Sequence, residues 1–409
     1  MPTHPSVADL IEAETTRQTE DICLIASENH ASPAVRSALG SVLVNKYAEG
    51  YPGKRYYAGN QIIDQIEQRA IDLAQSIFSA EHANVQPLSG APANLAIYAA
   101  LLKPGDTVLG MDLSHGGHLT HGHPVTLSAK LYNFIRYKTT PDGALDYDAM
   151  MNLARTHKPK LILVGYSSYS RDIDYQKVQA IADEVDALTM ADISHISGLI
   201  AAGLMNNPVP IFDVVMTTTH KTLRGPRGGL ILCKAEHAAA IDKSVFPGLQ
   251  GGPHENQVAA LAVALEEANT AMFKAYAKQT KENAATLASE LTDRGFTLAF
   301  GRTENHMLLV DLRNKQVSGK QAQEALEKAG IIANMNVIPD DPAKPTQPSG
   351  IRLGTPAITT RGMKESEVRN IAGWIDEIVD DIDNPAIPTR IRREVHELAR
   401  AFPPPSDIV

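Results

Sequence analysis

The sequence has few cysteines and no long apolar run. Its 409 residues include two cysteines, Cys23 and Cys233, which cannot form a disulfide framework and lack the spacing of metal ligands. We expect both to be small buried hydrophobic residues in a reducing compartment. No segment approaches the roughly 20 apolar residues that a membrane-spanning helix needs. These absences argue against a disulfide-rich secreted protein and against a membrane protein.

Excess positive charge is absent as well. The formal net charge of −9 at pH 7 argues against a general attraction to nucleic-acid phosphates. The first residues, Met-Pro-Thr-His-Pro-Ser, do not combine a basic region with an apolar core, so we expect no signal peptide. Internal repeats and low-complexity tracts are also missing. We therefore predict a cytoplasmic protein that binds neither nucleic acid nor membranes.

The overall composition is that of a globular protein, with 43% hydrophobic and 21% charged residues. Because 409 residues exceed what one small core can organise, we expect two domains. We predict an N-terminal arm or helix at residues 1–30, a large domain at 31–265 and a smaller α+β domain at 266–409.

Short runs rich in Val, Ile and Leu alternate with helical stretches after about residue 80. This order is typical of an α/β fold with a mostly parallel sheet covered by helices on both faces. We predict strands at Thr107–Met111, Leu161–Gly165, Ala187–Ala191, Val214–Met216 and Gly229–Cys233. Helices are expected at 6–20, 148–156, 175–185, 319–329 and 364–381, with one long helix from about 256 to 277 and beyond. Four prolines make 339–348 a loop, which we place on the substrate side.

Lys221 follows the predicted strand that begins at Val214, and polar residues flank it. Three threonines and His220 precede it, and Arg224 and Arg227 follow it, so an anionic ligand is plausible. A lysine amine can form a Schiff base with a carbonyl group when its pKa is lowered. Ligands of open α/β sheets bind at the ends of strands, which favours this role. A solvated surface lysine is the ordinary alternative.

Two further segments fit a pyridoxal cofactor on that lysine. Asp192 follows a predicted strand and could bind the pyridinium nitrogen, although a helix N-cap is an equally simple role. Ser89 and Gly90 form a turn before a helix that contains Pro92, which suits a phosphate at a helix start. Capping by Ser89 would explain the same residues. The combination of Asp192 with Lys221 favours the cofactor role.

Six long and unusual motifs occur along the chain. They are Leu24–Asn29, Asn45–Tyr57, Met111–Gly122, Thr217–Arg227, Phe246–Pro253 and Ser349–Ala357. Their sequences and their order resemble the serine hydroxymethyltransferase family, and the likeness extends from about residue 8 to residue 380.

The resemblance implies a fold-type I pyridoxal-phosphate enzyme with a seven-stranded, mostly parallel sheet, active as a homodimer or a dimer of dimers. It implies reversible transfer of a hydroxymethyl unit from L-serine to tetrahydrofolate, giving glycine and 5,10-methylenetetrahydrofolate. Lys221 would hold pyridoxal 5′-phosphate as a Schiff base, and tetrahydrofolate would be the co-substrate. Retro-aldol cleavage and direct displacement by folate are both compatible with these roles.

The resemblance also assigns the site residues. The catalytic residues would be Lys221, Glu49, His118, Asp192 and Tyr57. The cofactor would be bound by Ser89, Gly90, Ala91, His118, Asp192, His195, His220, Lys221, Tyr47, Gly252 and Ser167. The amino acid would contact Ser27, Glu49, Tyr57, Arg352 and Ser167, and folate would contact Leu113, Gly116, Gly117, Leu119 and Asn336.

Individual roles follow from the same resemblance. His118 would stack on the cofactor ring, and Asp192 would bind the pyridinium nitrogen. Arg352 would be the bidentate partner of the substrate carboxylate. Glu49, supplied together with Tyr57 by the neighbouring subunit, would act as acid or base on the serine hydroxyl. Tyr47 and Gly252 would also come from the neighbouring subunit.

Several positions depart from the family pattern. Ala91 stands where many relatives have serine, Ser194 replaces the usual alanine below the cofactor ring, and Met216 replaces a threonine. Met335 and 346–347 differ from the residues common near the folate side. The amino-acid chemistry should survive these changes, while folate affinity is less secure. Ser194 could tune the reaction or be silent.

Other functions stay open at this point. The first is a folate-independent aldolase of β-hydroxy amino acids, or an α-methylserine hydroxymethyltransferase. The presence of Leu113, Leu119, Asn336 and Glu49 favours folate. The second is a scaffold or RNA-binding protein, which would be free to lose Lys221. The four histidines within 115–123 lack accompanying thiolates or a carboxylate-rich segment, so we expect no metal site.

Overall fold

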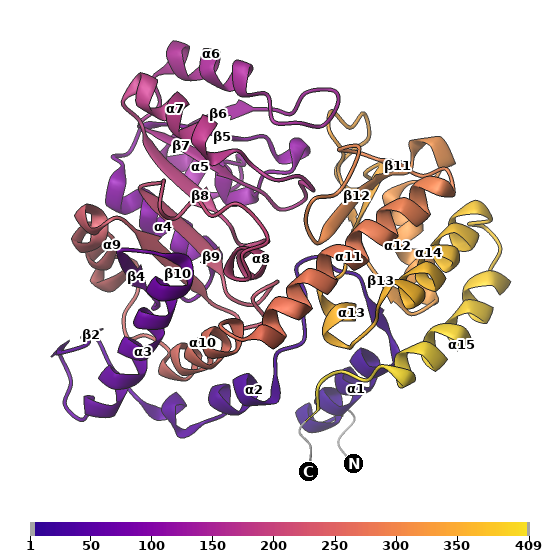
Figure 1. Cartoon of the computed structure of the whole chain (residues 1–409), viewed down its shortest axis with the longest axis horizontal. Helices are drawn as coiled ribbons and strands as arrows, with labels where there is room; N and C mark the ends of the chain where they lie inside the picture. Colours follow the sequence, from indigo (N-terminus) through magenta and orange to yellow (C-terminus); the bar gives the residue numbers. More distant parts are fainter. Residues whose placement is uncertain (1–4, 407–409) are drawn as a thin grey trace. The chain divides into compact units, whose positions relative to one another are not determined.

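The computed structural model describes residues 5–406 (Figure 1). The chain forms two compact units, one made of Met1–His30 with Gln279–Val409 and the other of Ala31–Lys278. Residues 1–4 and 407–409 lie outside the described part. The predicted boundaries at 30/31 and 265/266 stay a prediction.

The larger unit is built on a seven-stranded sheet with the strand order β4-β10-β9-β8-β7-β5-β6. Its strands are β4 (His82–Asn84), β5 (Thr107–Met111), β6 (Asn133–Tyr137), β7 (Leu161–Gly165), β8 (Leu188–Asp192), β9 (Val214–Thr218) and β10 (Gly229–Cys233). Strands β6, β5, β7, β8 and β9 are parallel, whereas β10 is antiparallel to both of its neighbours. The predicted α/β fold with a mostly parallel sheet is confirmed.

Helices flank this sheet (Figure 1). The larger unit contains α2 (Pro33–Leu39), α3 (Gln61–Phe78), α4 (Gly90–Leu101), α5 (Leu127–Leu131), α6 (Tyr147–His157), α7 (Tyr175–Val185), α8 (Ser197–Ala201), α9 (Ala238–Lys243) and α10 (Glu255–Ala268). Of these, α2 packs on α10. In α7 the buried residues Tyr175, Val178, Ile181 and Ala182 recur at helical spacing. One face of this helix therefore packs inward, as expected for a helix that covers a sheet.

The single long helix predicted from residue 256 onward is wrong, because the structure has two helices there. Helix α10 ends at Ala268, and α11 (Ala271–Asp293) begins after Thr270. The Thr270 hydroxyl oxygen accepts a hydrogen bond from the Phe273 N–H over 3.2 Å. The Thr270 side chain thus caps the start of a new helix, and the first helix ends before it. The alanine-rich periodicity of the sequence does not reveal this break.

The smaller unit contains a four-stranded antiparallel sheet with the order β11-β12-β15-β14. Its strands are β11 (Thr297–Leu298), β12 (Met307–Asp311), β14 (Asn334–Asn336) and β15 (Gly350–Gly354). Its helices include α12 (Gly319–Lys328), α13 (Pro356–Thr360), α14 (Glu365–Asp380) and α15 (Ala386–Ala401). Their core includes Leu308, Val310, Leu326, Ile371 and Ile375. The predicted proline-rich loop at 339–348 lies between β14 and β15 without helix or strand.

The N-terminal segment belongs to the smaller unit. Strand β1 (Ile22–Cys23) pairs in parallel with β13 (Ile331–Ile332), and α1 (Val7–Glu20) precedes it. The predicted helix at 6–20 is thus confirmed, but none of its residues is buried in this chain.

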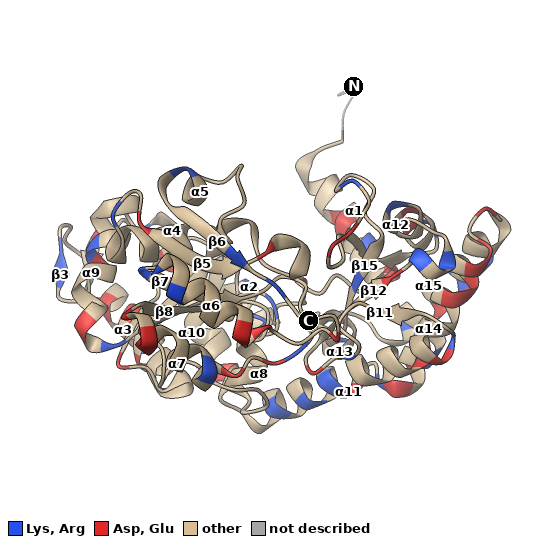
Figure 2. Cartoon of the chain, turned by 90° about the horizontal axis from the view of Figure 1, so that it is seen from above, with Lys and Arg blue, Asp and Glu red and all other residues tan. Residues whose placement is uncertain are grey.

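Charged side chains of both signs are interspersed on α14 and α15 (Figure 2), where Arg390 pairs with Glu377 and Glu394. These two helices therefore carry charged residues of both signs. Within residues 5–406, no helix combines the length and the apolar character that crossing a membrane would require.

Candidate functional site

The carboxyl ends of the parallel strands bring Asp192 and Lys221 to one edge of the sheet. Asp192 is the last residue of β8 and pairs in register with Met216 of β9. Lys221 lies just beyond the end of β9. In open α/β sheets ligands bind at this edge, so the two predicted site residues occupy the expected location.

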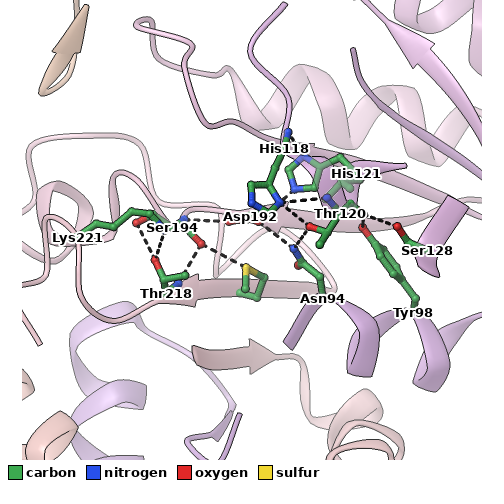
Figure 3. A network of polar contacts seen from close by, with 12 residues as sticks. Asn94, Tyr98, His118, Thr120, His121, Ser128, Asp192, Ser194, Thr218 and Lys221 are labelled. Carbon is green, nitrogen blue, oxygen red and sulfur yellow. Dashed lines mark hydrogen bonds and ion pairs between the residues drawn. The ribbon is translucent and has the colours of Figure 1, made fainter. Parts of the chain in front are cut away.

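Asp192 lies in a buried network of polar contacts (Figure 3). Its Oδ2 accepts hydrogen bonds from His121 Nε2 and Asn94 Nδ2, both over 3.1 Å. Its Oδ1 accepts a hydrogen bond from the Ser194 backbone N–H over 3.1 Å. The alternative role as a helix N-cap is not observed, because the N-cap of α8 is Ile196.

The surrounding hydrogen bonds fix which nitrogens of the two histidines carry protons. His121 Nδ1 accepts from the His118 N–H over 3.3 Å, so the His121 proton is on Nε2 and points at Asp192. His118 Nδ1 accepts from the Thr120 N–H over 3.2 Å and lies 2.7 Å from the Thr120 hydroxyl. The imidazole of His118 is therefore held by a turn that also positions His121.

The charge state of Asp192 follows from this network. Burial opposes ionisation, but the hydrogen bonds from His121 and Ser194 outweigh it and hold the pKa of Asp192 well below its usual value. A buried carboxylate that stays ionised can hold a proton on a basic ring nitrogen opposite it. This arrangement fits the pyridine nitrogen of a pyridoxal cofactor.

Lys221 is half-buried and its ammonium donates a hydrogen bond to the Thr218 hydroxyl over 2.7 Å. The preceding His220 is half-buried, and its Nδ1 has no hydrogen-bond partner within residues 5–406. Burial, with the positive charges of Lys221 and Arg227, lowers the pKa of His220 to about 3. His220 is therefore neutral at physiological pH and can still donate a hydrogen bond to an anion. The His195 carbonyl accepts a hydrogen bond from the Thr222 hydroxyl over 2.8 Å, which ties the two segments together.

The start of α4 fits a phosphate group. Ser89 is the N-cap residue, but its side chain makes no capping hydrogen bond, so the capping alternative is not observed. A Cβ on Gly90 would lie 2.6 Å from the Thr218 methyl carbon, so this helix start packs directly on β9. Backbone N–H groups at a helix start attract anions. Ala91 is exposed next to Gly90, and its backbone rather than its methyl group would serve such a site.

The segment from Leu113 to Leu119 forms tight turns beside the end of β7. Gly116 has a φ of +110° and its carbonyl accepts a hydrogen bond from the Ser167 N–H over 2.7 Å. A Cβ on Gly117 would lie 2.4 Å from the Met111 carbonyl oxygen. Both glycines are therefore required by the backbone, which is a structural reason for their presence independent of any ligand. Leu119 is 46% exposed on this segment.

The residues expected from a neighbouring subunit lie close together, with Tyr47 and Tyr57 exposed and Glu49 and Gly252 half-buried. The rings of Tyr47 and Tyr57 lie 4.9 Å apart, and Tyr47 donates a hydrogen bond to Glu49 Oε1 over 3.3 Å. The Glu49 charge raises the pKa of Tyr47, which keeps its phenol protonated. A Cβ on Gly252 would lie 3.3 Å from the Tyr47 ring. The structure thus brings these four residues together.

The smaller unit places Arg352 on β15, where it is 9% exposed. Arg352 donates hydrogen bonds to Asn334 Oδ1 over 3.1 Å and to the Ser27 hydroxyl over 3.4 Å. Burial lowers the pKa of Arg352 to about 10, which still leaves it charged at neutral pH. A buried guanidinium with these neutral partners suits a carboxylate ligand. Asn336 lies two residues along β14 from Asn334, and its Nδ2 donates to the Val337 carbonyl over 2.7 Å.

Sequence reasoning missed three residues of the Asp192 network. They are His121, Asn94 and Thr120. His121 was present only as part of a histidine cluster, and Asn94 only as part of a helix. Their spacing carried a signal, since Asn94 is one helical turn after Gly90 and His121 one short turn after His118.

Comparisons with known proteins identify the family of this chain. The family model described as Serine hydroxymethyltransferase matches residues 2–375. A curated protein named serine hydroxymethyltransferase, from Desulfotalea psychrophila (strain LSv54 / DSM 12343), is 54% identical over 401 residues, which are 98% of this chain and 94% of that protein. The chain therefore belongs to the serine hydroxymethyltransferase family of fold-type I pyridoxal-phosphate enzymes.

Proposed function

We propose that Asp192, His121 and Lys221 form the cofactor-binding half of the active site. The family assignment makes the protein a pyridoxal-phosphate enzyme that reversibly transfers a hydroxymethyl unit from L-serine to tetrahydrofolate, giving glycine and 5,10-methylenetetrahydrofolate. One observation carries the proposed site: an ionised buried carboxylate and a lysine lie at the ends of two adjacent parallel strands. The aldolase and α-methylserine alternatives are not favoured by the comparisons.

The cofactor would be held by residues of the larger unit. Lys221 would hold it covalently through Nζ, and the ionised Asp192 would keep the ring nitrogen protonated. When bound, pyridoxal phosphate accepts the electron pair released at the α-carbon of the amino acid. The Ser89–Ala91 backbone and the neutral His220 would bind the phosphate, and Tyr47 and Gly252 would reach it from a neighbouring subunit. His118, His195 and Ser167 would surround the ring.

Substrate binding would use charge and proton transfer at separate groups. Arg352, with Ser27, would bind the amino-acid carboxylate and so orient the bond that is broken. Glu49 would take the proton of the serine hydroxyl at a carboxylate oxygen, and Tyr57, whose ring lies against that of Tyr47, would also contact the hydroxyl. Leu113, Gly116, Gly117, Leu119 and Asn336 would contact folate.

We also propose a homodimer or a dimer of dimers in the cytoplasm. Apolar side chains are exposed on α1, at 42–44 and at Tyr56, which supports burial by a second copy of the chain. They include Val7, Leu10, Ile11, Val42, Val44 and Tyr56, each more than half exposed. The cysteines Cys23 and Cys233 are unpaired, which supports a reducing compartment.

The experiment that tests the site is a glycine titration of the cofactor-loaded enzyme, with and without tetrahydrofolate, in the wild type and in Lys221→Ala. The wild type should develop a long-wavelength absorbance band with glycine, and folate should enhance it sharply because the two ligands share one coupled site. Lys221→Ala should fold but lose turnover, since it lacks the amine that holds and releases the cofactor. It should also lose the covalent attachment that borohydride traps.

Two results would contradict this assignment. Undiminished turnover in Lys221→Ala would remove the lysine from the mechanism. A band that forms with glycine but ignores folate would show that the departures at Met335 and 346–347 have removed the pterin contacts.

A further inference from the structure

Ser194 makes three hydrogen bonds that join Asp192 to the support of Lys221 (Figure 3). Its backbone N–H donates to Asp192 Oδ1 over 3.1 Å. Its hydroxyl oxygen accepts from the Thr218 backbone N–H over 3.0 Å. Its carbonyl accepts from the Thr218 hydroxyl over 3.4 Å. Ser194 is 6% exposed, so water does not compete effectively for these contacts.

The hydrogen bonds of Thr218 have a defined direction. Because the Thr218 hydroxyl donates to the Ser194 carbonyl, its lone pairs are available to the Lys221 ammonium, which lies 2.7 Å away. The Thr218 backbone is held in place by the Ser194 hydroxyl. The serine hydroxyl therefore holds the backbone of Thr218, while the backbone carbonyl of residue 194 orients the Thr218 hydroxyl that accepts from Lys221.

The hydroxyl proton of Ser194 points along the same strand. The Ser194 hydroxyl donates to Met216 Sδ over 3.6 Å, and a thioether sulfur is a weak acceptor. Both contacts of this hydroxyl are thus made to β9, through Thr218 and Met216. The hydroxyl is engaged with the strand that leads to Lys221.

We propose that Ser194 is a positioning residue that acts on Lys221 through Thr218. The inference rests on the proposed role of Lys221 as the lysine that holds the cofactor. Ser194 fixes the turn after β9 so that the Thr218 hydroxyl stabilises the protonated amine of Lys221. Loss of the Ser194 hydroxyl loosens this acceptor and makes the charged form of Lys221 less favourable.

The test compares Ser194→Ala, Ser194→Cys and Thr218→Val in the full-length protein freed of cofactor. The rate at which Lys221 reacts with an amine-reactive reagent is followed across pH by peptide mass spectrometry. Thr218→Val removes the acceptor while keeping the side-chain shape, and should lower the pKa of Lys221 by about one pH unit. Ser194→Ala should lower the pKa of Lys221 by roughly half a pH unit. Ser194→Cys should lower it by less than Ser194→Ala, because sulfur can still accept a weak hydrogen bond and alanine cannot. The basic neighbours His220 and Arg227 are unchanged in every variant.

The matched control is Thr189→Val, which removes another buried hydroxyl from β8. Thr189 bonds to Asp213 at the opposite end of the strand from Asp192, so this variant should lose stability without changing Lys221. The double variant Ser194→Ala/Thr218→Val should match Thr218→Val alone, because both changes act through one acceptor.

Two outcomes would contradict the proposed role of Ser194, and a third would contradict the proposed function. An unchanged Lys221 titration in Ser194→Ala, with only a loss of stability like that of Thr189→Val, would reduce Ser194 to a structural hydroxyl. Additive shifts in the double variant would also overturn the route through Thr218. Failure of the proposed function is separate: borohydride would then fail to attach the cofactor to Lys221 in the wild type, whatever Ser194 does.

Discussion

At the scale of single residues, one buried acid in the larger unit lies outside the proposed chemistry. Glu255, the first residue of α10, is 1% exposed, and neither carboxylate oxygen has a hydrogen-bond partner within residues 5–406. Arg55 Nη1 lies 3.8 Å from a Glu255 oxygen, but the same guanidinium already pairs through Nη2 with Glu67 at 2.5 Å and through Nε with Asp64 at 2.8 Å. Burial, with the nearby charge of Glu67, raises the pKa of Glu255 from 4.5 to about 8.

The pKa of Glu255 predicts how stability depends on pH. Between pH 4.5 and about 8 the folded chain holds a proton that the unfolded chain has released. Stability therefore falls as pH rises through that window, by at most about 1.4 kcal/mol per pH unit from this group. Glu255→Gln removes the titration and should be more stable than the wild type at pH 9 by about 1–3 kcal/mol. Urea unfolding of the cofactor-free protein at pH 5, 7 and 9 measures this difference.

The control is Glu327→Gln, which alters an exposed acid of α12. It should leave the slope of stability against pH unchanged. A Glu255→Gln protein that declines with pH as steeply as the wild type would show that another group is responsible.

Lys221 and Asp192 could be found from the sequence because each follows an apolar strand, and strand ends are where ligands bind. The partners of Asp192 could not be found in the same way. Asn94 and His121 lie far from Asp192 in the chain and meet it only because α4 and a short helical turn pack at the same strand end. That placement depends on tertiary packing, which local periodicity does not encode.

At the scale of elements, a single arginine joins the ends of α1 and α15. Arg361 is 5% exposed and has no carboxylate among its hydrogen-bond partners in the described chain. Its guanidinium donates to the carbonyls of Gln18, Thr19, Asp21, Ala399 and Phe402. The last carbonyls of a helix lack intrahelical partners and carry its negative dipole end. Arg361 therefore satisfies the carboxyl-terminal ends of two helices together.

Replacing Arg361 should destabilise the carboxyl-terminal ends of both α1 and α15. Arg361→Met removes five hydrogen bonds to carbonyls, two of them buried and three partly buried, so we expect a loss of about 3 kcal/mol or more in the free energy of unfolding. Hydrogen exchange should rise in α1 and α15 before it rises in the sheet of the larger unit. Urea unfolding combined with exchange mass spectrometry measures both effects.

Arg400→Met is the matched control, because the Arg400 side chain is exposed and makes a long 3.5 Å contact with Glu20. It should change stability by no more than about 0.5 kcal/mol. Equal losses in the two variants would mean that Arg361 contributes no more than a surface charge.

Strands and helices themselves were readily predicted where the pattern was strong. The apolar runs at Thr107–Met111, Leu161–Gly165 and Gly229–Cys233 coincide with β5, β7 and β10. Such strands are covered on both faces, and their sequences are therefore nearly continuous runs of apolar residues. The break between α10 and α11 was missed because it depends on one threonine hydroxyl rather than on glycine or proline.

At the scale of the whole molecule, the proposed dimer predicts that Glu49 and Lys221 of one active site come from different subunits. Suppose that each active site takes Lys221 from one subunit and Glu49 from the other. The two active sites of a dimer then differ when one subunit carries a Lys221 variant and the other a Glu49 variant. A hybrid of Lys221→Ala and Glu49→Ala subunits would have one site that lacks both groups. Its other site would combine the intact Lys221 of one subunit with the intact Glu49 of the other.

Mixing the two inactive variants should therefore restore activity. After free subunit exchange half of the dimers are hybrids with one working site of two, so about a quarter of wild-type activity is expected from this symmetry. Native mass spectrometry of differently tagged subunits counts the hybrids, and the serine-dependent formation of methylenetetrahydrofolate measures their turnover. Hybrids that form in full yield but stay inactive would place both residues in one subunit. The exposed rings of Tyr47 and Tyr57 next to the half-buried Glu49 would then need another explanation, because their exposure in this chain is what supports contact with a neighbouring subunit.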